Sequence, residues 1–111
     1  MPTFSFGDTL LVPFPFTDLV LVKRRPCVVL STQAFNQANG QSVMAMITSA
    51  KASTWSGDID IHDIASAGIS HPSVIRFKLF TLPNDLVLRK LGALAPPDMA
   101  KLRTGVRHIF A

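Results

Sequence analysis

Two runs of strand-forming residues, at 9–12 and 27–30, are joined by a bend rich in proline and phenylalanine, and they constrain the fold more than any other feature. Proline holds φ near −65° and cannot join a central strand. The Pro-Phe alternation after the first run therefore predicts a stiff bend. We expect the chain to begin with two strands whose separation this bend fixes.

Three consecutive cations, Lys23, Arg24 and Arg25, come directly before the second run. Pro26 has no N–H to donate and biases Arg25 toward extended geometry, so we expect the guanidinium at a strand mouth rather than inside a ladder. Arginine presents a planar fork of donors that matches phosphate oxygens. The alternative interpretation is a solvated basic turn, which is the usual state of a charge run.

The remainder of the chain reads as further short strands and one long helix. Residues 42–48 are almost continuously apolar, which suits a central strand, and residues 58–62 alternate as a half-exposed strand does. Strand formers also fill 73–82 and 86–91. A short helical turn is expected after Thr32, and apolar residues at helical spacing follow Pro96 toward the end of the chain.

These elements predict a mainly β fold, an SH3-like barrel of five to seven antiparallel strands with a C-terminal α-helix and one or two short helical turns. We expect one domain over residues 1–111. No apolar run approaches the roughly 18 residues of a membrane span, and the first residues lack the basic and apolar regions of a signal peptide. The expected location is the cytoplasm.

Composition narrows the classes of function. The net charge of +4 and the pI near 9.9 favour an anionic partner. The three histidines lack metal-ligand spacing, the lone Cys27 reads as a buried, inert thiol, and the six glycines never cluster as a phosphate loop does. We therefore expect no metal and no cofactor.

Cations and hydroxyl groups at the ends of predicted strands form the best candidate for chemistry. They are Arg25, Thr48, Ser49 and Lys78, with Asp18 in the facing loop. Cleavage of RNA without a metal needs a base for the ribose 2′-hydroxyl, donors to the phosphorane oxygens and a proton for the leaving 5′-oxygen. Arginine and lysine supply the donors, and threonine or serine adds a neutral hydrogen bond.

The general base is left open among Asp18, Lys78 and Arg25. Each candidate also has a structural alternative. Thr48 reads equally as a strand-end hydroxyl that satisfies the backbone, and Lys78 as an exposed strand lysine.

Aromatic residues near this basic edge are suited to stack on unpaired bases. Phe14, Phe16 and Trp55 are the candidates, although Phe14 and Phe16 also suit a core and Trp55 a protein interface. Together with Ser49, the residues expected to contact RNA are Lys23, Arg24, Phe16, Thr17, Trp55 and Arg76.

Six passages in order, GDTLLVPFPFTD, KRRPCVVLS, AMITS, WSGDIDI, PSVIRFKLFTLP and LRKLG, resemble the PemK/MazF toxins of bacterial toxin–antitoxin pairs, in particular the PemK-like branch. The resemblance implies an SH3-like barrel that forms a homodimer and cuts single-stranded RNA or mRNA at short sequences without metal, leaving 2′,3′-cyclic phosphate and 5′-hydroxyl ends. It also implies inhibition by a small antitoxin whose disordered tail fills the RNA groove.

The same resemblance assigns roles to particular residues. The catalytic arginine before proline corresponds to Arg25 and the strand-end threonine to Thr48, while Lys78 matches the polar residue that completes the site in some members. Asp18 ends the PFPFTD signature. Relatives commonly carry small flexible residues after this Asp, whereas residues 19–22 here are all apolar.

Two other functions fit the same sequence. A basic barrel also suits a nucleic-acid-binding module without chemistry, and SH3-like barrels often serve as protein-interaction domains. Binding to operator DNA as a toxin–antitoxin complex is a further expectation from the resemblance, with the antitoxin supplying most of the readout.

Overall fold

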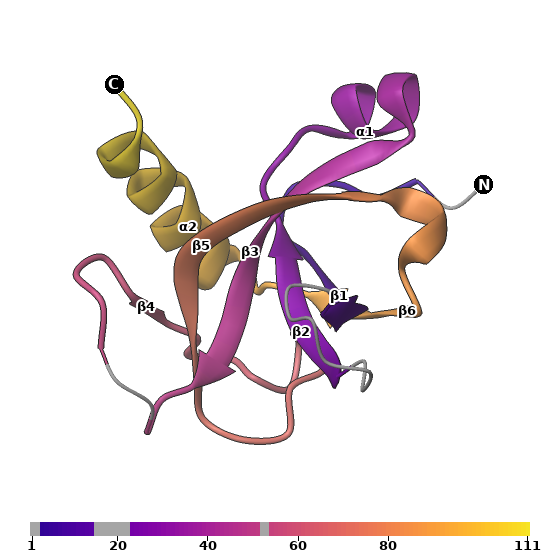
Figure 1. Cartoon of the computed structure of the whole chain (residues 1–111). Helices are drawn as coiled ribbons and strands as arrows, with labels where there is room; N and C mark the ends of the chain where they lie inside the picture. Colours follow the sequence, from indigo (N-terminus) through magenta and orange to yellow (C-terminus); the bar gives the residue numbers. More distant parts are fainter. Residues whose placement is uncertain (1–2, 15–22, 52–53) are drawn as a thin grey trace.

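The computed structural model describes residues 3–14, 23–51 and 54–111, and these form six strands, two α-helices and one 3₁₀ turn (Figure 1). In chain order the elements are β1 (Asp8–Phe14), β2 (Lys23–Val29), α1 (Gln33–Asn39), β3 (Gln41–Ser49), β4 (Ile59–Asp60), β5 (Ser73–Pro83), η1 (Asn84–Leu86), β6 (Arg89–Ala93) and α2 (Pro96–Ile109).

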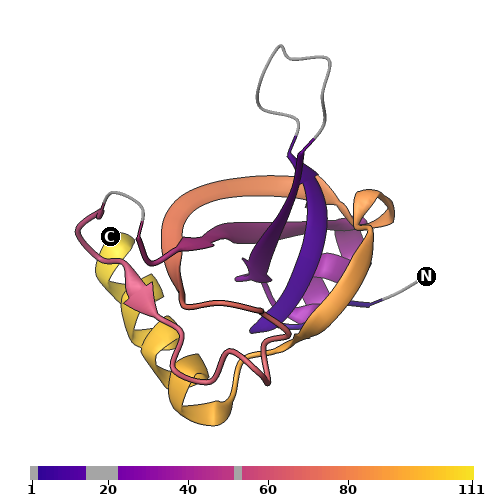
Figure 2. The ribbon, with the colours of Figure 1, turned by 90° about the horizontal axis from the view of Figure 1, so that it is seen from below.

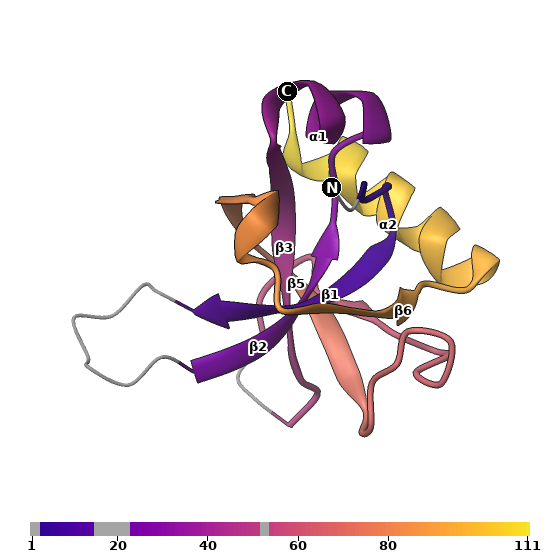
Figure 3. The ribbon, with the colours of Figure 1, turned by 90° about the vertical axis from the view of Figure 1, so that its right-hand side faces the viewer.

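All six strands belong to one antiparallel sheet in the order β4-β5-β3-β2-β1-β6. The sheet curls into a half-barrel, and Figure 2 shows the long, strongly bent β5 sweeping around it. Helix α2 lies along one side of this half-barrel (Figures 1 and 3). The mainly β, SH3-like prediction with a C-terminal helix is confirmed.

The sheet has an apolar cluster on each of its faces. One includes Val28, Ala45, Ile47 and Ile75 and packs against Leu102 of α2. The other includes Cys27 and Met44, on the opposite face of the same strands. Because successive side chains of a strand point to opposite faces, β2 and β3 contribute to both clusters and so lie at the centre of the fold.

The prediction that Arg25 lies outside a ladder is wrong in one respect. Arg24 and Arg25 are inside β2, where they pair with Pro13 and Val12 of β1. On its other side, however, β2 pairs with β3 only from Cys27 onward. Pro26 has no N–H to donate, so it is tolerated here because β2 has no hydrogen-bonded neighbour on its β3 side at this residue. The arginines are therefore paired on one side only.

Two strand boundaries differ from the sequence expectation. The strand expected at 58–62 is reduced to Ile59–Asp60, and the last strand begins at Arg89 instead of residue 86. The residues directly after Pro83 form the 3₁₀ turn η1, in which the N–H of Val87 donates to the carbonyl of Asn84. β6 also continues through Gly92, where a Cβ would collide with the Ser66 carbonyl.

The short helix α1 ends as its sequence predicts. The Thr32 hydroxyl accepts a hydrogen bond from the N–H of Phe35 at 3.2 Å, which satisfies one of the free donors at the helix start. Gly40 follows the helix with φ 63°, a left-handed conformation that glycine adopts at low cost. The chain can therefore turn directly into β3.

Candidate nucleic-acid interface

A cavity of about 270 Å³ opens where the start of β2 and the end of β3 separate. Figure 1 shows these two ends diverging, with the segment that leads into β5 crossing below them. We call this the strand-end cavity. Its lining residues are Arg24, Arg25, Pro26, Ile47, Thr48, Ser49, His71 and Ser73.

Strand register explains why residues far apart in sequence meet in this cavity. β2 and β3 pair Cys27 with Met46, and continuing that register by two residues sets Arg25 opposite Thr48. Thr48 and Ser49 in turn pair with Val74 and Ser73 of β5. Side chains directly opposite one another share a face of the sheet. The arginine and the threonine predicted from sequence therefore lie together.

The strand-end cavity is cationic. Arg24 and Arg25 are exposed, and the ion pairs found among the described residues use other cations, joining Arg76 to Asp58, Lys90 to Asp8 and Lys101 to Asp98. Lys23, also exposed, precedes the two arginines at the start of β2. Two guanidinium groups beside hydroxyl groups form a set of donors suited to a phosphodiester.

His71, like Ser73, is a polar lining residue that sequence reasoning missed. Its neighbourhood is well tied down: the buried Ser73 hydroxyl donates to the His71 carbonyl at 2.9 Å, and the N–H of Ala50 donates to the Pro72 carbonyl at 3.1 Å. The sequence did contain a signal for His71. If the strands expected at 42–48 and 73–82 pair antiparallel, the residues just before 73 lie beside the end of the first strand.

Lys78 does not line the strand-end cavity. β5 carries a bulge in which Leu79 pairs with Ala45 and Arg76 with the next residue, Met46, so that Lys78 lies in the extra segment between them. The side chain is exposed. The structure therefore brings Arg25 and Thr48 together and leaves Lys78 further along the sheet.

Arg76 is 8% exposed, and its guanidinium forms an ion pair with Asp58 at 2.9 Å. This hydrogen bond, opposed by burial and helped by the N–H of Trp55, holds the pKa of the Asp58 carboxyl below its ordinary value. It also raises the pKa of Arg76, with burial opposing the change. The guanidinium is thus engaged inside the protein, which does not suit the phosphate contact expected from sequence.

Trp55 is 46% exposed and lies over the Arg76 guanidinium, 5.3 Å from ring centroid to Cζ. Arg76 is two residues from Val74, the partner of Thr48, and so lies on the same face about 7 Å along the sheet. Asp58 fixes this arrangement by accepting the Trp55 N–H at 2.9 Å. The ring is therefore held on the face that carries Thr48.

Phe16, Thr17 and Asp18, together with the apolar residues 19–22, lie outside the described residues. Their predicted roles remain predictions.

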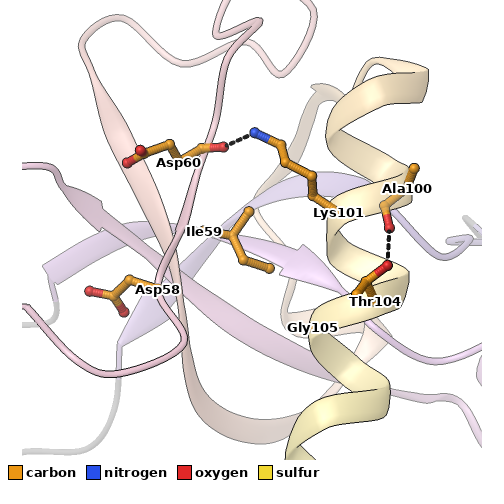
Figure 4. A pocket seen from close by; sticks show the side chains of 7 residues that line it. All are labelled: Asp58, Ile59, Asp60, Ala100, Lys101, Thr104 and Gly105. Atoms are coloured by element: carbon orange, nitrogen blue, oxygen red, sulfur yellow. Dashed lines mark hydrogen bonds between the residues drawn. The ribbon is translucent and has the colours of Figure 1, made fainter.

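A larger cavity, of about 540 Å³, lies between β4 and α2 (Figure 4). We call it the helix cavity. Its lining residues are Asp58, Ile59, Asp60, Ala100, Lys101, Thr104 and Gly105. Lys101 donates to the Asp60 carbonyl at 2.8 Å and pairs with the buried Asp98 at 3.2 Å, while the Thr104 hydroxyl donates to the Ala100 carbonyl. Two aspartates and internally bonded donors make this cavity a poor site for RNA.

Titratable groups elsewhere suit structure more than chemistry. Burial raises the pKa of the Cys27 thiol to about 12, so this thiol is inert at neutral pH. Among residues 3–14, 23–51 and 54–111, no three His, Cys or Asp side chains gather as metal ligands would. Within that same part of the chain, no helix has both the length and the apolar character needed to cross a bilayer.

Comparison with known proteins gives a family and a set of similar folds. Residues 6–110 match the family described as PemK-like, MazF-like toxin of type II toxin–antitoxin system. A search of curated protein sequences finds no significant match.

Three solved structures illustrate the structural likeness. An endoribonuclease in complex with its cognate antitoxin, from Mycobacterial species, is 17% identical, with a TM-score of 0.75 over 97% of this chain and 93% of that chain. A MazE–MazF structure from Deinococcus radiodurans is 18% identical, with a TM-score of 0.75 over 97% and 96%. Mycobacterium tuberculosis toxin MazF-mt6 is 17% identical, with a TM-score of 0.71 over 91% and 93%. At these identities the likeness is one of fold.

Proposed function

The chain belongs to the PemK-like, MazF-like toxins of type II toxin–antitoxin systems, and from this premise we propose that it is a metal-independent endoribonuclease that cleaves single-stranded RNA or mRNA. The observation that carries the proposal is the strand-end cavity, where Arg25 and Thr48 line one space. Both are residues to which the family resemblance assigns catalytic roles.

In the proposed reaction the ribose 2′-oxygen loses its proton and bonds to phosphorus, and the bond from phosphorus to the 5′-oxygen breaks. The products are a 2′,3′-cyclic phosphate and a 5′-hydroxyl. Charge builds up on the phosphorane oxygens, where the Arg25 guanidinium donates hydrogen bonds and stabilises it. The Thr48 hydroxyl adds one neutral hydrogen bond.

Other cations act around the scissile phosphate in this proposal. Arg24 shares the cavity with Arg25, and the exposed Lys23 and Lys78 lie outside it, where they suit neighbouring phosphates. Trp55 stacks on a flanking base, a contact worth about 1 to 3 kcal/mol. Asp18 and Lys78 remain candidates for the general base.

A cognate antitoxin is the proposed inhibitor, and a homodimer in the cytoplasm is the proposed form of the enzyme. The endoribonuclease from Mycobacterial species is in complex with its cognate antitoxin. By analogy, we expect an antitoxin to compete with RNA for this chain. Operator DNA is a proposed ligand of the toxin–antitoxin complex only.

The test is incubation of a mixed single-stranded RNA with the protein in EDTA, followed by labelling of new ends with polynucleotide kinase. Fragments with 5′-hydroxyl ends support the endoribonuclease. Arg25→Ala should reduce the rate about 100- to 1,000-fold. Because Arg25 is exposed and has no ion-pair partner among the described residues, its thermal midpoint should not change.

Arg107→Ala is the matched control, because Arg107 is an exposed arginine of α2 that lines neither cavity. It should cleave at the wild-type rate. Intact RNA that is retarded in a gel, in a salt-dependent manner, would instead indicate a binding module without chemistry. If the protein neither cleaves nor binds RNA, the result would indicate a protein-interaction domain.

A further inference from the structure

The proposed reaction needs a proton donor at the leaving 5′-oxygen, and none of the roles assigned so far supplies it. Among the residues lining the strand-end cavity, arginine does not give up its proton in proteins, and serine and threonine hydroxyls are weak acids. Histidine is the side chain whose ordinary charge change falls between about pH 5 and 8. Of the residues that line the cavity, His71 is the one with a ring nitrogen that can carry a proton to a leaving group.

The backbone around His71 is set by bonds on both sides. Pro72 biases the preceding residue toward extended geometry, and its own carbonyl accepts the N–H of Ala50, directly after β3. The His71 carbonyl accepts a hydrogen bond from the Ser73 hydroxyl, and Ser73 pairs with Ser49 in the β3–β5 ladder. These contacts fix the His71 backbone beside the end of β3, where Thr48 and Ser49 lie, and the His71 side chain lines the same cavity as both.

The ring has one nitrogen available. Nδ1 lies 3.3 Å from the Ser70 hydroxyl, while Nε2 has no hydrogen-bond partner among the described residues. The charged groups on the elements around the ring are Arg24 and Arg25 of β2, and the β3 and β5 residues of the cavity are neutral. A phosphodiester held by those guanidinium groups would be within the same small space as the imidazole.

A third cavity, apolar and of about 200 Å³, adjoins the strand-end cavity, because Pro26 and His71 line both. Its other walls include Leu11, Ile69 and Leu91. His71 therefore lies at the boundary between the cationic and the apolar cavity. A leaving group that departs across this boundary would pass the imidazole.

We propose that His71 is the general acid of the reaction, donating from Nε2 to the 5′-oxygen. As the P–O5′ bond breaks, the proton passes from the imidazolium to the departing oxygen, which leaves as a neutral hydroxyl. The neutral imidazole then recovers a proton from water. The inference rests on the proposed endoribonuclease function.

The experiment compares two versions of one oligoribonucleotide, built around a cleavage site mapped first with the wild-type protein. One carries the natural 5′-oxygen at that site, and the other carries a bridging 5′-sulfur. A thiolate leaves readily without a proton, so loss of a general acid slows only the oxygen substrate. Single-turnover rates are measured for wild type, His71→Gln, Arg25→Ala and the control His108→Gln, an exposed histidine of α2.

His71→Gln should cleave the oxygen substrate about 100- to 1,000-fold more slowly than wild type and the sulfur substrate at nearly the wild-type rate. Arg25→Ala should be slow on both substrates, since the phosphorane charge still requires its guanidinium. His108→Gln should match wild type on both.

Equal slowing of both substrates by His71→Gln would overturn the general-acid role and leave His71 a positioning residue. Wild-type rates in that variant would remove His71 from the reaction while leaving the endoribonuclease intact. Failure of the wild-type protein to cleave RNA at all would overturn the proposed function and, with it, this inference.

Discussion

The helix cavity and the strand-end cavity differ in size and in how many of their polar groups are already paired. The helix cavity is the larger, about 540 Å³ against about 270 Å³, yet its Lys101 is already bonded to the Asp60 carbonyl and to Asp98, and its Asp58 to Arg76. The strand-end cavity is smaller, but its two arginines form no ion pair with any other described residue. Polar groups that still lack a partner mark the candidate site better than volume does.

Two arginines of the same sheet, Arg76 and Arg25, also differ in whether their charge is already paired. Arg76 is buried, paired with Asp58 and covered by Trp55, so its charge holds the fold together. Arg25 is exposed at the edge of the strand-end cavity and free to meet a ligand. Residue type alone did not separate these roles, because both are arginines on strands of a basic protein.

The largest effect, a loss of stability, is expected from Asp98→Asn in α2, next to the helix cavity. Asp98 is 1% exposed, and its carboxylate accepts the N–H groups of His62 and Asp63 at 3.0 and 2.9 Å. An amide replaces one acceptor with a donor, so the free energy of unfolding should fall by about 2 kcal/mol. Urea unfolding measures this.

Asp60→Asn is the control, because this aspartate lines the helix cavity with an exposed side chain. It should change the free energy of unfolding by less than about 0.5 kcal/mol. A similar loss in both variants would show that general charge, rather than the buried hydrogen bonds of Asp98, stabilises this region.

The next largest effect is on the cleavage rate, and it is tested by replacing one threonine from each cavity. Thr48→Val removes the hydroxyl with little change of shape, and cleavage should slow about 10-fold, the value of one neutral hydrogen bond of about 1.4 kcal/mol. Thr104→Val, in the helix cavity, loses only a bond to its own helix and should cleave RNA at the wild-type rate. Equal rates in both variants would remove the Thr48 hydroxyl from the reaction.

The smallest effect is a pH dependence from Asp58. Its pKa is lowered in the folded protein, so its contribution to stability is present above the unfolded value near 4 and is lost as the pH falls through the folded value. Asp58→Asn should therefore be less stable than wild type at pH 7, by about 1 kcal/mol or less, with the difference shrinking below pH 4. Thermal midpoints across pH 3 to 7 measure the difference, and a constant difference would contradict the ion-pair account.

Sequence patterns anticipated much of the candidate site. Arg25 was found because proline follows a cation at a predicted strand, and Thr48 because a hydroxyl ends an apolar run; both line the strand-end cavity. Trp55 was expected on the basic edge and is held on the face that carries Thr48. Arg76 and Lys78 were expected to act on RNA, but Arg76 is paired with Asp58, and a bulge in β5 leaves Lys78 outside the strand-end cavity.

Local order along the chain was enough to predict the antiparallel barrel and the C-terminal helix. Alternation, caps and proline restrict the backbone over only a few residues, and a sequence displays those restrictions directly. Whether His71 faces Arg25, or Arg76 is neutralised by Asp58, depends on which strands pair and in what register. Those contacts join residues far apart in the chain, so only the tertiary structure decided them.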